Sequence, residues 1–337
     1  MKSLTLFNNK GGVGKTTLTF HLAHMFARLG KRVLVLDYDP QCNLSANFLE
    51  ESALFDLWED SSRRSSNVAG CLEPVRIGKG DVRAPEPIEV APDLWLLPGE
   101  LSLGLFEQVL AEEWPKTLAT SNERALDVTT ALDLLSNLAA ERVSADYVFI
   151  DIGPSLGALN RAAVLACDAV VLPLAPDLFS LQGMRNLGPT LRDWRKDWSL
   201  VRTSRMTGRI QASMPPHEFQ PIGYIVQQHL VRADRPTEGY AKWAREIPLE
   251  FQSQVVGEGV AWVMCGDDGK VDFAGDRYCL GTVRHFASLV PLAQLARKPM
   301  FDLKQADGIG GVQINAVARC KREFEGLANT LIQHLAD

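Results

Sequence analysis

The sequence contains no apolar run that approaches the ~20 residues a helix needs to span a bilayer. It also has no basic, apolar and small-residue leader, because a glycine-rich segment begins at residue 8. Six cysteines are scattered without a C-x-x-C pair or a cysteine–histidine cluster, a pattern that indicates neither a disulfide framework nor a zinc site. From these absences we expect a cytoplasmic protein with no evident membrane anchor.

Positive charge is in short supply, with 35 Lys and Arg residues against 41 Asp and Glu residues and a net charge of −6. This balance excludes a wholly basic nucleic-acid-binding surface, although it permits a local basic patch. The 337 residues, 46% of them hydrophobic, are enough for one large α/β domain. We expect a single domain over residues 1–337 with insertions at about 59–92, 194–220 and 257–280.

The most informative stretch is Asn8–Thr17, with the sequence NNKGGVGKTT. It follows a short apolar run, residues 4–7, and precedes a helical pattern, residues 18–29. It matches the phosphate-loop pattern G-x-x-x-x-G-K-[ST], except that Asn9 stands in place of the first glycine. A strand, a glycine-rich loop and a helix are the context in which such a match is credible.

The chemistry of this loop indicates a nucleotide site. Gly11, Gly12 and Gly14 allow positive φ, so that successive backbone N–H groups can face an anion. The helix N-terminus adds positive charge. Lys15 can reach the β- and γ-phosphate oxygens, and the hydroxyl of Thr16 is placed for Mg²⁺. The alternative is a glycine-rich turn that binds no ligand.

Three acids follow apolar runs that are typical of buried parallel strands. Asp37 and Asp39 follow residues 32–36, and Asp151 ends the run 147–151. Any one of them alone could be a helix cap or a turn residue. Beside a phosphate loop, carboxylates can hold the waters of Mg²⁺ and orient an attacking water.

Apolar runs alternate with helical patterns along the chain, which predicts an α/β fold with a mainly parallel twisted sheet and helices on both faces. Ligands in such folds bind at the carboxyl ends of the strands, so the loop and the three acids should share one rim. The expected strands are residues 2–7, 32–36, 94–97, 147–151, 169–173 and 221–226. The expected helices are residues 18–29, 103–114, 127–143, 180–198, 236–247 and 312–334.

Smaller features complete this prediction. A helix should follow the second strand, capped by Asn43 or Ser45. A break is expected at Pro115 and residues 120–122, where one helix gives way to the next. Residues 59–92 are expected to form a loop or a small excursion, and residues 266–269 a hairpin turn.

Several motifs resemble one family. Lys10–Thr17 resembles the deviant Walker A motif of the ParA/MinD ATPases, most closely the ParA/Soj-like partition ATPases. Val35–Ser45 resembles the next ParA motif, D-x-D-P-Q-G-N, with Cys42 in place of the glycine. Phe149–Gly157 resembles their Walker B segment, with Gly153 where many members have proline. Residues 169–181 and 298–301 are also similar to ParA sequences.

The resemblance implies roles at the phosphates. The fold would be a P-loop NTPase of the deviant Walker A type, and the reaction Mg²⁺-dependent ATP hydrolysis. Lys10 would reach the nucleotide of the other subunit in an ATP sandwich dimer, and Lys15 would hold the phosphates in its own subunit. The residues implied in binding ATP are Gly11, Gly12, Val13, Gly14, Lys15, Thr16 and Thr17.

The resemblance also implies which residues contact Mg²⁺, the attacking water and the adenine ring. Thr16 would ligate Mg²⁺, and Asp37 and Asp151 would act through its waters. Asp39 would orient the attacking water, which makes it catalytic together with Lys10 and Lys15. Gln227, at the end of the strand 221–226, stands where relatives often place an amide that contacts adenine.

Function is then expected to be that of a nucleotide switch in plasmid or chromosome partition, or in cargo positioning. The ATP dimer would bind DNA without sequence preference, and a protein partner would stimulate hydrolysis. Two basic clusters could contact phosphates. They are Arg192, Arg195, Lys196, Arg202, Arg205 and Arg209, among Trp194 and Trp198, and a second set, Arg232, Arg235, Lys242 and Arg245.

Other functions stay open. The chain could be a MinD-like membrane-associated ATPase, although the helix 312–334 does not end as a basic amphipathic anchor. It could serve a dedicated protein partner in another system through its insertions. A relation to nitrogenase iron proteins would need a bridging cysteine pair, for which Cys167 is the suggestive residue. His21 and His24 lie one helical turn apart and are expected to be structural.

Overall fold

The computed structural model describes residues 1–119, 122–203, 218–228, 238–257 and 273–336. Contacts along the chain divide it into two compact units. The first unit comprises Met1–Leu6, Thr16–Val170 and Trp194–Gln220. The second unit comprises Phe7–Lys15, Val171–Asp193 and Pro221–Asp337.

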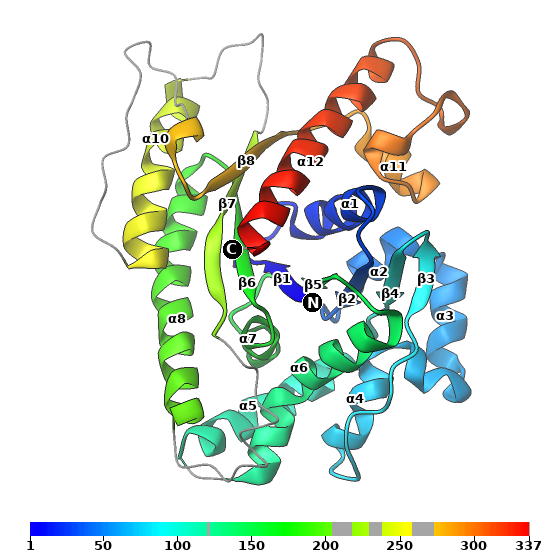
Figure 1. Ribbon diagram of the computed structural model, residues 1–337, viewed down its shortest axis with the longest axis vertical. Helices are drawn as coiled ribbons and strands as arrows, with labels where there is room; N and C mark the ends of the chain where they lie inside the picture. Colours follow the sequence, from blue (N-terminus) through cyan, green and yellow to red (C-terminus); the bar gives the residue numbers. More distant parts are fainter. Residues whose placement is uncertain (120–121, 204–217, 229–237, 258–272, 337) are drawn as a thin grey trace. The chain divides into compact units, whose positions relative to one another are not determined.

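The strands are mainly parallel and lie in the order β3-β4-β2-β5-β1 in the first unit and β6-β7-β8 in the second (Figure 1). In the first unit β2 pairs in parallel with β4 and β5, and β1 with β5, whereas β3 runs antiparallel to β4. In the second unit β7 and β8 are parallel. The strands are β1 Lys2–Leu6, β2 Val33–Asp37, β3 Ile88–Ala91, β4 Leu94–Leu97, β5 Tyr147–Asp151, β6 Ala169–Leu174, β7 Gln220–Gln228 and β8 Cys279–Arg284.

Helices connect the strands as expected for an α/β fold (Figure 1). In the first unit α6 packs on β2, and in the second unit α12 packs on β8. The α-helices are α1 Lys15–Arg28, α2 Asn43–Phe48, α3 Glu51–Glu59, α4 Val68–Arg76, α5 Leu103–Ala119, α6 Glu123–Val143, α7 Ala158–Leu165, α8 Leu178–Thr203, α10 Glu238–Glu250, α11 Val290–Ala296 and α12 Val312–Ala336. Short 3-10 and π turns lie between some of them, including η1 Ser61–Ser66.

The central strands were the best predicted elements. Every residue of β2 is buried, and β5 is buried from its second residue onward. Parallel strands that are covered on both faces have continuous apolar sequences. For this reason β2 and β5 could be recognised from the sequence. The expected fold class is confirmed.

Residues 59–92 were predicted to form a loop or a small excursion. The loop alternative was wrong, because this segment contains η1, α4 and β3. Asn67 caps α4 by accepting a hydrogen bond from the Gly70 N–H at 2.6 Å. The helix then buries residues at the spacing i, i+3, i+4 and i+7. They are Val68, Cys71, Leu72 and Val75.

Two local predictions were also wrong. The break at Pro115 does not occur, since α5 continues to Ala119 with Trp114 and Thr117 buried on either side of the proline. The change of helix expected at 120–122 is confirmed, because α6 begins at Glu123 with Asn122 as its cap. Neither Asn43 nor Ser45 caps α2: Cys42 holds that position in the left-handed region, at φ 56°, without a side-chain cap. The expected hairpin at 266–269 lies outside the described residues.

Candidate nucleotide site

The phosphate loop in the second unit is tied down by Asn8. The Phe7 N–H donates to the Val171 carbonyl at 2.9 Å, which continues the strand pairing up to the loop. The buried Asn8 side chain donates to the Pro173 carbonyl at 2.8 Å and accepts from the Lys10 N–H at 2.9 Å. The start of the loop is therefore fixed to the end of β6.

Two loop glycines have backbone conformations that need glycine. Gly12 has φ 74° and Gly14 has φ 73°. A Cβ on Gly14 would also lie 2.5 Å from Nε2 of Gln227. A Cβ on Gly11, by contrast, would meet nothing within 4 Å. The two positive φ angles turn the chain where an anion-binding loop requires it.

Lys15 is the first residue of α1, and 7% of it is exposed. Its amine donates to the Asn8 carbonyl at 3.0 Å and to the Lys10 carbonyl at 3.3 Å. The amine is thus held inside the loop at the N-terminus of the helix, where a phosphate group would be favoured.

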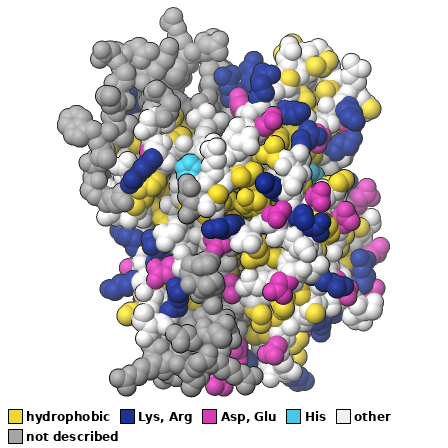
Figure 2. All heavy atoms as spheres, in the orientation of Figure 1, with side chains coloured by type: hydrophobic (Ala, Val, Ile, Leu, Met, Phe, Trp, Pro, Cys, Tyr) yellow, Lys and Arg dark blue, Asp and Glu magenta, His cyan; other side chains and the backbone are white. Residues whose placement is uncertain are grey.

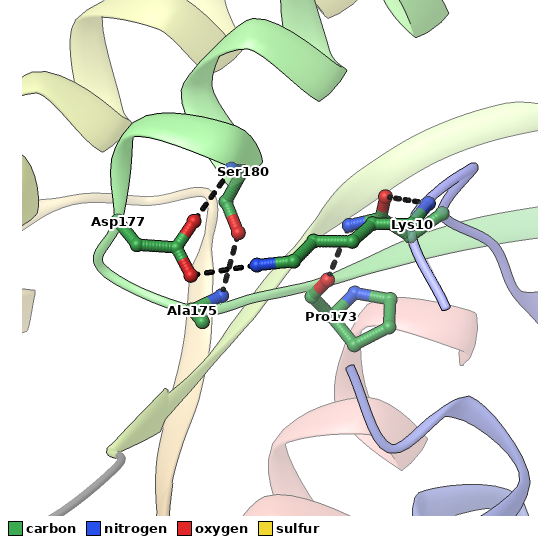
Figure 3. A network of polar contacts seen from close by, with 6 residues as sticks. Lys10, Pro173, Ala175, Asp177 and Ser180 are labelled. Atoms are coloured by element: carbon green, nitrogen blue, oxygen red, sulfur yellow. Dashed lines mark hydrogen bonds and ion pairs between the residues drawn. The ribbon is translucent and has the colours of Figure 1, made fainter. Parts of the chain in front are cut away.

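Lys10 points in another direction. Its amine lies 2.7 Å from Oδ2 of Asp177, and its side chain is 30% exposed (Figure 3). Asp177 precedes α8 and was not singled out by the sequence. The Lys15 amine therefore contacts carbonyls of the loop, whereas the Lys10 amine contacts a carboxylate outside the loop. Different contacts of this kind are what different roles would require.

The oxygen ligands expected for a metal come together in the first unit. The Thr16 hydroxyl donates to Oδ2 of Asp151 at 2.9 Å. Asp37 and Asp151 end neighbouring parallel strands, are register partners, and are both fully buried. Because Thr16 directly follows Lys15, the chain itself links this cluster to the loop.

Asp37 also organises the segment that follows β2. Its Oδ2 accepts from the Ser45 N–H at 2.8 Å and from the Ser45 hydroxyl at 2.6 Å. That hydroxyl in turn accepts from the Gly99 N–H at 2.9 Å. Burial raises the pKa of Asp37 to about 6, the hydrogen bonds from Ser45 oppose this rise, and the charge of Asp39 adds to it.

Asp39 lies just beyond this strand end and is 6% exposed. Its Oδ1 accepts from the Gln41 N–H at 3.0 Å. A Cβ on Gly153 would lie 3.3 Å from the same oxygen, so the glycine at this position lets the carboxylate approach the Walker B segment. Gly153 and Asp39 are thus neighbours in space, which the sequence did not show.

Gln227 lies against the loop from the end of β7. Its Nε2 donates to the Val13 carbonyl at 2.6 Å. The expected adenine contact of Gln227 stays a prediction. The contact with Val13 shows that this side chain belongs to the surroundings of the loop.

The basic cluster on α8 is only partly a surface feature. Trp194 and Trp198 are buried, and Arg195 lies 3.9 Å from Glu218. Lys196 is exposed. Of the second cluster, Lys242 and Arg245 on α10 are exposed. Arg205, Arg209, Arg232 and Arg235 lie outside the described residues.

The remaining candidates pack into the structure. Cys167 is 4% exposed and its thiol donates to the Ala163 carbonyl at 3.2 Å. His21 is buried, and His24 packs against Phe48. Within the described parts of the chain, no helix is long and apolar enough to cross a membrane.

A glycine-rich loop with its lysine at a helix N-terminus, together with acids that end parallel strands, defines a P-loop nucleotide-binding protein. A family model described as an AAA domain matches residues 1–201. The chain belongs to this family, and within it to the ParA/MinD type of partition and positioning ATPases. The resemblance read from the motifs is thereby confirmed.

Two relatives illustrate the match. Over 191 residues the chain is 29% identical to the sporulation initiation inhibitor protein Soj of Bacillus subtilis, covering 57% of this chain and 65% of Soj. The alignment thus spans just under two thirds of Soj. Over 298 residues it is 31% identical to an uncharacterized protein of Pseudomonas putida, covering 88% of this chain and 97% of that protein.

A solved structure has a similar fold. It is that of a plasmid partition protein from Borrelia burgdorferi bound to AMPPNP, with a TM-score of 0.60 and 17% sequence identity. The match covers 98% of both chains.

Proposed function

We propose that the chain binds MgATP at the loop and hydrolyses it, and that ATP brings two copies together as a sandwich dimer. The observation that supports this most directly is the 2.9 Å hydrogen bond from Thr16 to Asp151. It sets the hydroxyl that follows Lys15 beside a fully buried carboxylate, which is the pairing a Mg²⁺-nucleotide site uses.

The residues present fit Mg²⁺. The hydroxyl of Thr16 and the carboxylates of Asp37 and Asp151 are hard oxygen donors, which this ion prefers. Thr16 would bind the ion and the two acids would bind its waters. When bound, Mg²⁺ would neutralise charge on the β- and γ-phosphates.

Each remaining residue has a defined task in this proposal. Lys15 binds the phosphates of its own subunit, and Asp39 accepts a hydrogen bond from the attacking water and orients it. Lys10 binds the phosphate of the partner subunit, as an arginine finger does, so that hydrolysis depends on dimerisation. Phosphoryl transfer needs such alignment and charge neutralisation more than covalent help.

The variants Lys10→Ala and Asp39→Ala test these tasks. Both should still bind ATP, because Lys15 and the loop are intact, and both should lose at least about a hundredfold in turnover. Binding is measured by titration with ATP and turnover by phosphate release, with exposed Lys79→Ala as the control. Wild-type turnover in Lys10→Ala would contradict the role of Lys10 in trans.

For the biological role, we propose that the ATP dimer binds DNA without sequence preference, in partition or in cargo positioning. Lys242 and Arg245 on α10 are the better candidates, because both are exposed whereas the α8 cluster holds buried tryptophans. On the face in Figure 2, basic and acidic side chains are interspersed over the described residues. A local patch fits such a surface better than a broad basic one.

DNA retention measured with and without ATP tests this role. Retention should require ATP, weaken as salt is raised, and fall by about tenfold in the double variant Lys242→Ala/Arg245→Ala. Glu246→Ala, on the same helix, is the control. Retention that ignores both ATP and salt would contradict the proposal and favour a dedicated protein partner instead.

Membrane positioning finds less support in the structure. The helix α12 buries one face of its last four turns, and that face is in contact with protein. Its buried residues are Cys320, Phe324, Leu327, Ala328, Leu331 and Leu335. Sedimentation with anionic liposomes should leave the ATP-bound protein in the supernatant.

A further inference from the structure

The amine of Lys10 is held against the first turn of α8. It lies 2.7 Å from Oδ2 of Asp177 (Figure 3). It also lies 5.5 Å from the ring centroid of Phe179. Both partners come from the N-terminal end of one helix, and all three residues belong to the second unit. A carboxylate and an aromatic face are each attractive to an ammonium group.

Asp177 has a second contact that fixes it in place. Its Oδ1 accepts from the Ser180 N–H at 2.7 Å, which caps α8, and the Ser180 hydroxyl accepts from the Ala175 N–H at 3.2 Å (Figure 3). The two carboxylate oxygens thus serve different groups: one holds the helix end and the other holds Lys10.

The backbone of Lys10 is anchored separately, through Asn8. The amine can therefore leave Asp177 by side-chain rotation, without any change in the backbone of the loop or in the cap of α8. The lysine side chain is 30% exposed and the aspartate side chain 37% exposed, so water can replace each partner as they part.

We propose that Asp177 is the resting partner of Lys10, and that the ion pair must open before the Lys10 amine can serve the nucleotide of a second copy. This inference rests on the proposed function, in which Lys10 acts in trans. A carboxylate that stayed beside the amine would repel the triphosphate that the amine has to reach. The ion pair therefore opposes the formation of the ATP-bound dimer.

Because both side chains are partly exposed, the restraint is small. Ion pairs of this kind are worth little, and removing the pair from both subunits should strengthen the ATP dimer by about two- to fivefold. Asp177→Asn is the informative variant, since asparagine also caps helices and removes only the charge. Asp39→Ala serves as the common background, so that ATP is not consumed during the measurement.

The dimer dissociation constant in saturating ATP is measured by analytical ultracentrifugation for Asp39→Ala and for Asp39→Ala/Asp177→Asn. The second protein should dimerise about two- to fivefold more tightly at low salt, and the two constants should converge as salt screens the pair. The matched control is Glu73→Gln in the same background. Its ion pair with Arg76 has side-chain exposures of 37% and 29%, close to those of Asp177 and Lys10.

The outcomes separate the two ideas. If Asp39→Ala forms no dimer with ATP, the proposed function fails. If it dimerises but Asp177→Asn leaves the constant unchanged or weakens the dimer, the role of Asp177 is wrong and the proposed function stands. The role of Asp177 is also wrong if Glu73→Gln strengthens the dimer to the same extent.

Discussion

Single residues set the shape of the loop. The glycines at positions 12 and 14 were recognisable in the sequence because a phosphate loop needs positive φ at such points. The partner of Lys10 was not recognisable. Asp177 is 167 residues away in the chain, and no local pattern reports a pairing at that distance. The contact between Asp37 and Ser45 was missed because Ser45 was expected to cap α2.

The glycine at position 14 gives a direct test of the loop geometry. Gly14→Ala should lower the free energy of unfolding by about 1–3 kcal/mol, because alanine is strained at φ 73° and its Cβ would overlap with Gln227. Denaturant unfolding measures the difference. Gly11→Ala is the control and should change stability far less, since a Cβ there meets nothing within 4 Å. Equal effects of the two substitutions would argue against this loop conformation.

His21 predicts a pH dependence of stability. Burial lowers the pKa of His21 to about 4. The hydrogen bond of its ring with the Thr17 carbonyl acts in the opposite direction, but its effect is smaller. The unfolded chain takes up this proton near pH 6.5 and the folded chain does not, so the free energy of unfolding falls as pH drops from 6.5 towards 4. Between pH 7 and 5, wild type should lose about 2 kcal/mol more than His21→Phe.

Urea unfolding at the two pH values measures this loss. If wild type and His21→Phe lose the same free energy on acidification, His21 is not a buried neutral group.

Among the elements, burial decided what could be predicted. The buried strands β2 and β5 carry continuous apolar runs and were predicted within a residue of their bounds. The end strands β3 and β8 were missed: β3 has no buried residue, and in β8 only Leu280 and Val283 are buried, so neither shows a continuous apolar run. In α4 the helical spacing was present, but the serine and arginine residues before it suggested a loop.

The cap of α4 tests this interpretation. Asn67→Ala should lower the free energy of unfolding by about 1 kcal/mol, because the buried Gly70 N–H loses its acceptor. Asn67→Asp keeps an acceptor at this position and should cost less. Thermal or urea unfolding of the three proteins would show the order, and an alanine variant as stable as wild type would mean that the cap contributes nothing.

At the scale of the whole molecule, the sequence predicted the fold and the strand-end acids but not how two copies pair. The P-loop fold and the acids at the strand ends follow from local motifs, and the structure brings Thr16, Asp37 and Asp151 together as expected. The proposed role of Lys10 depends on a second copy of the chain, because Lys10 would act at the nucleotide of that copy. The sequence of one chain does not show how two copies pair. A measurement on mixed proteins addresses that step.

The most direct measurement is ATP turnover after mixing Lys10→Ala with Asp39→Ala. Each protein alone should be nearly inactive. In a mixed dimer, however, the site in the Lys10→Ala subunit keeps its own Asp39 and receives Lys10 from the other subunit. At equal amounts the mixture should recover about a quarter of wild-type turnover, since half of the dimers are mixed and each has one complete site. Turnover that stays at the sum of the two separate proteins would contradict the account.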